Sequence, residues 1–283
     1  MDESEFDNFI HTIRLAGVHY VRDMMCMFET ADDNGDYKEG AWERSSHYNS
    51  IMNSYAKEGI KVQFMCDGWY NGQMTEQAQY AKLGKLPADM TKAYNFSKNI
   101  ASRWLGTIDN YEIGNEHDLM YNRPDKFAAY TKICAIGADS ANSGISISDG
   151  GFSGKKLYIN RFYANDVKDY LDVLSVHQYN VYDGRDGIYP ISNNVKNKFC
   201  ADNEKFGLDK KRLWLNEHDL QVAYNANATE LDESQQKSQS RYVAASFVKQ
   251  IANGADKVFL YKHGYTPERG YSYSSFSQDN HPY

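Results

Sequence analysis

The chain has 283 residues, of which 41% are hydrophobic, and a formal charge of −7. This length and composition suffice for one large core, so we expect residues 1–283 to form a single domain. Lys and Arg form no basic cluster, which argues against nucleic acid as a partner, and no apolar run reaches the roughly 20 residues of a membrane helix.

One pattern recurs along the chain. Apolar residues at helical spacing are followed by a Gly or polar turn and then by a short run typical of a strand. The predicted helices are marked by Phe6 to Ile13, Tyr48 to Tyr55, Ala93 to Trp104, Phe127 to Ala138, Val195 to Phe206 and Val243 to Ile251. The predicted strands are residues 18–24, 60–66, 111–114, 145–148, 171–177, 212–217 and 257–261.

Strands that alternate with helices, without repeated hairpin signals, indicate parallel βα units. The dinucleotide fingerprint of many doubly wound sheets is missing, and the length favours an α/β fold of the (β/α)8 TIM barrel type. Such a barrel has eight strands, and the pattern predicts seven. We therefore expect an incomplete barrel, with the first strand and last helix outside this sequence, and a chain that is a fragment of a longer one.

Three polar segments are predicted to be long loops that follow strands, namely residues 29–45, 178–194 and 220–235. In a barrel, the loops that follow strands shape the substrate cleft. The four cysteines have no paired metal-type spacing, which favours buried free thiols.

The pentapeptide Asn-Glu-His-Asp-Leu occurs twice, at 115–119 and at 216–220, each time directly after a short apolar run. Each copy is thus predicted to place a carboxylate at the end of a buried strand, as two-carboxylate sugar chemistry requires. We interpret Glu116 and Glu217 as a catalytic pair. The alternative from the same residues is a metal-dependent hydrolase, in which the duplicated Asn-Glu-His-Asp tetrads hold a dinuclear centre.

If the missing strand is the first, Glu116 ends the fourth strand of a barrel and Glu217 ends the seventh. That placement resembles the clan A glycoside hydrolases, in which Asn-Glu at strand four supplies the acid/base and a Glu at strand seven the nucleophile. Arg22 stands where the clan has an Arg at the end of strand two, and His177-Gln178-Tyr179 resembles the His-x-Tyr that ends strand six. The order of sequence motifs along the chain is most similar to that of glycoside hydrolase family 39 and related bacterial endoglycosidases.

The resemblance implies a retaining β-glycoside hydrolase that acts on a β-linked polysaccharide or oligosaccharide without cofactor or metal. Glu116 would be the general acid/base, and Glu217 the nucleophile, kept ionised by Arg22 and the hydroxyl of Tyr179. Asn115 would hydrogen-bond the sugar 2-hydroxyl. The resemblance also favours a secreted or periplasmic location, although residues 1–5 are acidic where a secretion signal is basic.

Three further residues are candidate sugar contacts. His177 would orient a carboxylate or touch the sugar, and Trp69 and Tyr261 would stack on sugar rings. Ordinary packing of these side chains is the alternative, as is pairing of Arg22 with Asp23 or Glu29.

The chain departs from the clan pattern where His-Asp follows each Asn-Glu, and where Leu260 stands at the usual position of a Trp. A barrel that binds glycans without cleaving them is therefore a second hypothesis. The sequence leaves the sugar, the choice between endo and exo action, and the oligomeric state open.

Overall fold

The computed structural model describes residues 3–26, 31–32, 34–38, 47–67, 86–87, 89–119, 123–141, 144–181, 202–223, 231–261 and 271–272. The chain forms two compact units, and each is described by itself. The first comprises Met1–Leu174 and Phe206–Lys211, and the second comprises Ser175–Lys205 and Arg212–Tyr283. Within the described residues, no helix is long and apolar enough to cross a membrane.

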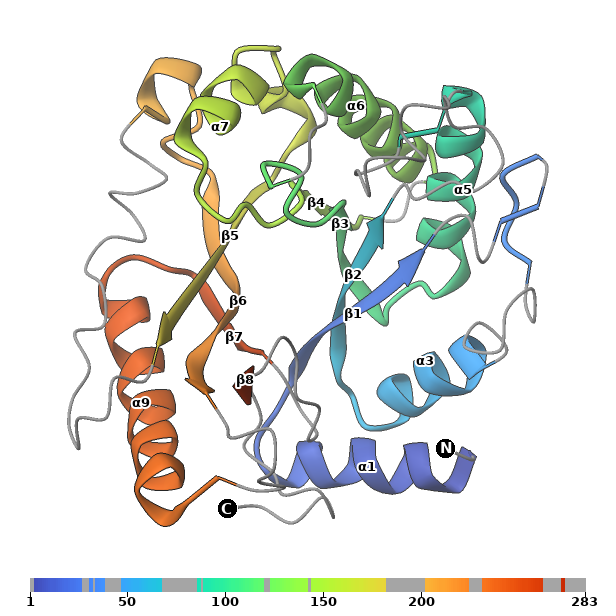
Figure 1. Ribbon diagram of the computed structural model, residues 1–283. Coiled ribbons are helices and arrows are strands. Elements are labelled where there is room, and N and C mark those ends of the chain that lie inside the picture. The colour runs from blue at the N-terminus through green and yellow to red at the C-terminus, as the bar shows by residue number, and fades with distance from the viewer. Residues whose placement is uncertain are drawn as a thin grey trace. The chain divides into compact units, whose positions relative to one another are not determined.

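The first unit alternates helices and parallel strands (Figure 1). Its helices are α1 (Glu3–Leu15), α3 (Tyr48–Lys57), α5 (Met90–Arg103), α6 (Pro124–Ser140) and α7 (Lys156–Tyr163), with the short 3-10 helix η2 (Lys168–Tyr170). The 3-10 helix η3 (Glu204–Phe206) begins in the second unit and ends in the first. Its strands are β1 (Tyr20–Cys26), β2 (Lys61–Asp67), β3 (Ile108–Ile113), β4 (Ser146–Ser148) and the start of β5 (Val173–Val181). Consecutive strands pair in parallel.

The second unit contains the rest of β5, β6 (Arg212–Ala223), α9 (Glu233–Ala252), β7 (Lys257–Leu260) and β8 (Tyr271–Ser272). The seven parallel strands follow one another in the order β1 to β7, and β8 pairs antiparallel with the end of β6. Sequential parallel strands with intervening helices are the architecture of a (β/α) barrel. All seven predicted strands are therefore present, in the predicted order.

An aromatic cluster fills the core of the first unit beneath α6 and α7. Phe127, Phe152 and Phe162 are fully buried, and their ring centroids lie 5.1–6.3 Å apart. Helices α5 and α6 lie close together because α6 carries Gly137, where a Cβ atom would come within 2.4 Å of the Tyr94 carbonyl oxygen. Cys66 and Cys134 are buried and free, and burial raises the pKa of the Cys134 thiol to about 12.

Helix α9 buries a polar face. A capping box between Asp232 and Gln235 starts the helix. Its buried residues are Ser238, Gln239, Tyr242, Ser246 and Gln250. The apolar residues that predict this helix are only partly covered, and Ile251 is half exposed.

Several sequence-based boundaries are wrong. The predicted loops 178–194 and 220–235 begin too early, because β5 continues to Val181 and β6 to Ala223. The second predicted loop also ends too late, because α9 begins at Glu233. The helix α7 between β4 and β5 is not predicted, although Ile159, Phe162 and Tyr163 have helical spacing and are buried. Most of the predicted helix at 195–206 lies outside the described residues, as does much of the loop 29–45.

Candidate active site

The first Asn-Glu copy begins directly after β3. The strand ends at Ile113, and Gly114 turns the chain with φ +83°. A Cβ atom at Gly114 would meet the ring of His117 at 2.6 Å, so only glycine fits this turn. Glu116 follows with φ +47°, which is rare for a residue with a side chain, and is half-buried.

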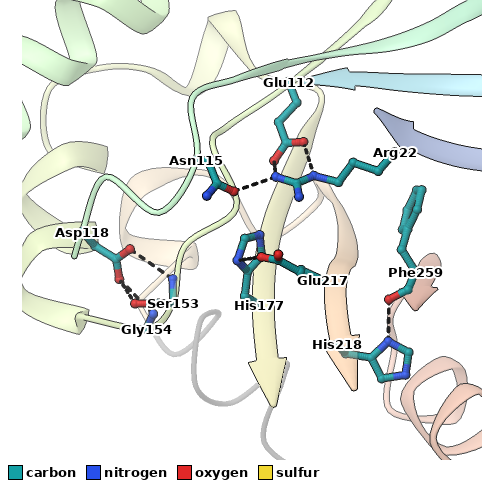
Figure 2. A network of polar contacts seen from close by, with 10 residues as sticks. All are labelled: Arg22, Glu112, Asn115, Asp118, Ser153, Gly154, His177, Glu217, His218 and Phe259. Atoms are coloured by element: carbon teal, nitrogen blue, oxygen red, sulfur yellow. Dashed lines mark hydrogen bonds and ion pairs between the residues drawn. The ribbon is translucent and has the colours of Figure 1, made fainter. Parts of the chain in front are cut away.

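Asn115 belongs to a charged network within the first unit (Figure 2). Arg22 donates to both carboxylate oxygens of the buried Glu112, at 2.6 and 3.0 Å, and to Asn115 Oδ1 at 2.8 Å. Such a bidentate pair fixes the guanidinium plane. Because Asn115 Oδ1 accepts a hydrogen bond from the guanidinium, its Nδ2 atom carries the donors that remain for another group.

Sequence analysis missed Glu112, which lies on β3 and pairs with Arg22. The sequence predicts that Arg22 keeps Glu217 ionised, with pairing to Asp23 or Glu29 as the alternative. Glu29 lies outside the described residues, and the contact between Arg22 and Glu217 stays a prediction. A charge inside the apolar run Tyr111-Glu112-Ile113 was the available signal, because a buried carboxylate requires a cationic partner.

The second Asn-Glu copy lies within a strand. Asn216 and Glu217 belong to β6, and the pairing register of β6 with β7 shifts between Leu215 and His218. Bulges of this kind re-aim side chains next to active sites. The sequence predicts that Glu217 ends its strand, but β6 continues beyond it. Glu217 instead lies at a register shift, near the end of the segment of β6 that pairs with β7.

His177 contacts the carboxylate of Glu217. Its Nδ1 atom lies in ion-pair distance of Glu217 Oε2, and both side chains are buried (Figure 2). His177 is likewise inside a strand, because β5 runs four residues beyond it to Val181. A shared proton between imidazole and carboxylate fixes the orientation of both groups.

Two more candidate residues meet in the second unit. The rings of Tyr179 and Tyr261 form an edge-to-face pair with centroids 5.9 Å apart. Both side chains are half-buried, so part of each ring remains accessible. Trp69, the other stacking candidate, lies outside the described residues.

The residues that follow each Asn-Glu have different surroundings in the two copies. His117 is buried and stacks on Phe127 with centroids 3.9 Å apart, and the buried Asp118 accepts hydrogen bonds from Ser153, Gly154 and Lys155. His218 contacts the Phe259 carbonyl through Nδ1 and Ser246 Oγ through Nε2, at 2.8 Å for the second contact. These two imidazoles and Asp118 are thus engaged by protein groups, which weakens the idea of a metal centre built from the tetrads.

Burial shifts the ionisation of both residues that follow Glu217. It lowers the pKa of His218 to about 4, because the imidazolium would lose its hydration. It raises the pKa of Asp219 well above its usual value, and Asp219 Oδ2 has no hydrogen-bond partner in the described part of the chain. The His218 side chain is therefore uncharged in the folded state at neutral pH, and burial favours the protonated form of Asp219.

No family model matches the chain, and no curated protein matches it in sequence. Many solved structures are similar in fold, and three of them are described here. A glucosidase from Croceicoccus marinus has a TM-score of 0.71 and 14% identity, over 96% of this chain and 60% of that one. A family 39 glycoside hydrolase from Bacteroides cellulosilyticus WH2 has a TM-score of 0.68 and 18% identity, over 98% and 58%.

The third is an exo-β-1,4-mannosidase from Opitutaceae bacterium strain TAV5, with a TM-score of 0.65 and 13% identity, over 93% of this chain and 49% of that one. The chain thus spans about half to 60% of the length of these three proteins. At such identities the similarity shows the fold. That fold is the (β/α)8 barrel of the glycoside hydrolases, the group that the sequence resembles.

Proposed function

We propose that the chain is a glycoside hydrolase barrel that cleaves β-linked oligosaccharides or polysaccharides with retention of configuration. The observation that carries the proposal is topological. Within one parallel strand order, Glu116 follows β3 and Glu217 lies near the end of the β7-paired part of β6, three strands later. Enzymes with this fold draw catalytic groups from the carboxyl ends of several strands. The names of the similar structures, a glucosidase and a mannosidase, agree with a carbohydrate substrate.

In the first step, the carboxyl group of Glu116 donates its proton to the glycosidic oxygen as the bond from C1 to that oxygen breaks. The carboxylate of Glu217 forms an ester with C1 from the opposite face. In the second step, Glu116 takes a proton from water while the water oxygen attacks C1 and the ester breaks. The sugar leaves with its original configuration, because C1 is inverted twice.

The contacts of Glu217 suit the role of nucleophile. His177 contacts Oε2 and so would orient the carboxylate that attacks C1. An oriented carboxylate loses less entropy on reaching the transition state. In this proposal His177 is a positioning residue.

The network around Asn115 suits contact with the sugar. The Arg22–Glu112 pair holds the Asn115 amide through Oδ1, so that Nδ2 would donate to the 2-hydroxyl. Arg22 therefore acts through Asn115 in this proposal. Tyr179 and Tyr261 would offer ring faces to sugar, as would Trp69.

The test is turnover of a panel of aryl β-glycosides and soluble β-glucans and β-mannans, with NMR of the first product. We expect hydrolysis with the β anomer formed first. Glu217→Gln and Glu116→Gln should each lower kcat/KM by about a hundred- to ten-thousand-fold. Asp125→Asn, an exposed isosteric change, is the control and should leave kcat/KM unchanged.

A mechanism-based fluoro-glycoside inactivator followed by peptide mass spectrometry should place the covalent sugar on Glu217. First formation of the α anomer would overturn retention. Binding of the same glycans without turnover by the wild-type chain would instead favour the glycan-binding hypothesis.

A further inference from the structure

The segment that carries Glu116 is attached to the loop that follows β4. The Glu116 amide donates to the carbonyl oxygens of Gly150, at 2.8 Å, and Gly151, at 3.2 Å. Its left-handed backbone conformation is strained for a residue with a Cβ atom. The conformation persists only if the surroundings over-determine it.

Asp118 supplies a strong restraint two residues later. Its Oδ1 atom accepts from the Ser153 amide at 3.0 Å, and Oδ2 accepts from the Ser153 hydroxyl, the Gly154 amide and the Lys155 amide at 2.8–3.0 Å. Four hydrogen bonds to one buried carboxylate, three of them from consecutive backbone amides, form a clamp between the two loops (Figure 2).

Close packing fixes the other end of the segment. The ring of His117 is stacked on Phe127 within 11° of parallel, and Gly114 packs against both rings, because a Cβ atom there would come within 2.6 Å of His117 and 3.0 Å of Phe127. A Cβ atom at Gly150 would come within 2.5 Å of the Ile113 carbonyl oxygen, so the β4 loop approaches the end of β3 at backbone contact. Glu116 is therefore held from both sides, by packing before the clamp and by Asp118 after it.

The same residue type in the second pentapeptide copy makes no such clamp. Asp219 is buried, and among the described residues it accepts one hydrogen bond, from the amide of Leu220. Its pKa is raised by burial. The clamp at Asp118 thus belongs to the turn that presents Glu116, and not to the pentapeptide as such.

We infer that Asp118 is a positioning residue for the general acid Glu116, an inference that rests on the proposed function. A general acid must lie within hydrogen-bond reach of the leaving oxygen, and a misplacement of about 1 Å costs about a hundred-fold in rate. The clamp prevents Glu116 from relaxing to ordinary backbone angles, which would swing its carboxyl group away from the oxygen it protonates.

The test compares wild type with Asp118→Asn, which replaces one acceptor oxygen by an amino group that faces backbone N–H donors. Ser153→Ala removes one of the four bonds, and Asp125→Asn is the matched control at an exposed aspartate. Each is assayed with aryl β-glycosides whose leaving groups range from dinitrophenyl, which departs without protonation, to phenyl, which needs it.

For Asp118→Asn we expect kcat/KM to fall about ten- to a hundred-fold with the phenyl glycoside and less than about threefold with the dinitrophenyl glycoside. Glu116→Ala gives the reference pattern for a missing acid, and Ser153→Ala should show a weaker form of it.

An equal loss with every leaving group would overturn the inference, since general destabilisation cannot distinguish the substrates. Hydrogen exchange supplies a readout that needs no activity. Asp118→Asn should lose protection in the peptide 114–119 while α5 and α6 keep theirs, and unchanged protection there would also overturn the inference. Absence of turnover by wild type on every glycoside would overturn the proposed function instead.

Discussion

At the scale of single residues, the chain places the same side chains in contrasting environments. His117 is used as a flat ring against Phe127, whereas His218 uses both nitrogens, one toward the Phe259 carbonyl and one toward Ser246. The first contact requires a flat ring. The second depends on a neutral imidazole, because a carbonyl oxygen needs a donor and the buried site disfavours a charge.

The depressed pKa of His218 predicts a pH-dependent stability. The unfolded imidazole titrates near its usual value of about 6.5, and the folded one near about 4, so the unfolded state binds more protons between these values. The free energy of unfolding should therefore fall as the pH drops through this window, by about 3 kcal/mol at most. Urea unfolding of wild type and His218→Gln at pH 7 and pH 4.5 checks this. A wild-type loss no larger than that of the variant would contradict it.

Asp219 changes the free energy of unfolding with pH in the opposite direction to His218. Its folded pKa is raised by burial, so the folded state keeps a proton that the unfolded state releases above its ordinary value of 3.8. This contribution lowers the free energy of unfolding as the pH rises. Asp219→Asn, which does not titrate, should unfold at higher urea than wild type at pH 8, with a smaller gain at pH 4. Equal midpoint shifts at both values would remove Asp219 as the cause.

At the scale of elements, periodicity located the strands but not their lengths. Residues 171–177 and 212–217 predict strands of the right position, yet β5 and β6 continue to Val181 and Ala223. The polar residues after His177 and Glu217 suggest loops. At the end of β6 the chain stays extended because it pairs with β8, and no local sequence pattern encodes such pairing.

The sequence pattern also could not predict which face of helix α9 is buried. Its apolar residues predict the helix correctly, but the buried side is polar. Ser246 lies against His218, and Gln239 donates to the Leu220 carbonyl at 3.3 Å, so partners on β6 select this face. Hydrophobic period alone could not reveal that β6 presents hydrogen-bonding groups to the helix.

The close contact of α5 and α6 can be tested at Gly137. Alanine in a helix interior normally stabilises by about 1 kcal/mol relative to glycine. Here the added methyl would meet the Tyr94 carbonyl oxygen at 2.4 Å, so Gly137→Ala should instead destabilise by about 1–3 kcal/mol. Thermal unfolding against Ile136→Ala, at the exposed neighbour, makes the comparison. A higher melting temperature for Gly137→Ala would contradict this, because it would mean that α5 and α6 accommodate the methyl group without loss of stability.

At the scale of the whole molecule, sequence pattern predicts the strand series and the fold. The comparisons agree with it, while the chain spans about half to 60% of the similar proteins. The repeated motif marks Glu116 and Glu217 as candidate site residues, and their catalytic roles stay a prediction. The candidate site was not predictable where partners are distant in sequence, as for Glu112 with Arg22, 90 residues apart.

Metal dependence is a property of the whole molecule, because the metal hypothesis draws ligands from both tetrads. His117, Asp118 and His218 already contact protein groups, which leaves the tetrads short of ligands for a dinuclear centre. We expect glycoside turnover to persist unchanged after dialysis against EDTA. Loss of turnover that added Zn²⁺ or Mn²⁺ restores would reinstate the metal hypothesis, and a parallel loss of helical circular dichroism would expose simple unfolding.

The repeated pentapeptide also has an evolutionary consequence. One copy forms a turn with a left-handed Glu116 and the other a strand, so selection acts on the two copies through unrelated constraints. The identity of the two copies is therefore not required by either local structure, and substitutions at positions 117 and 218 should be tolerated independently of each other.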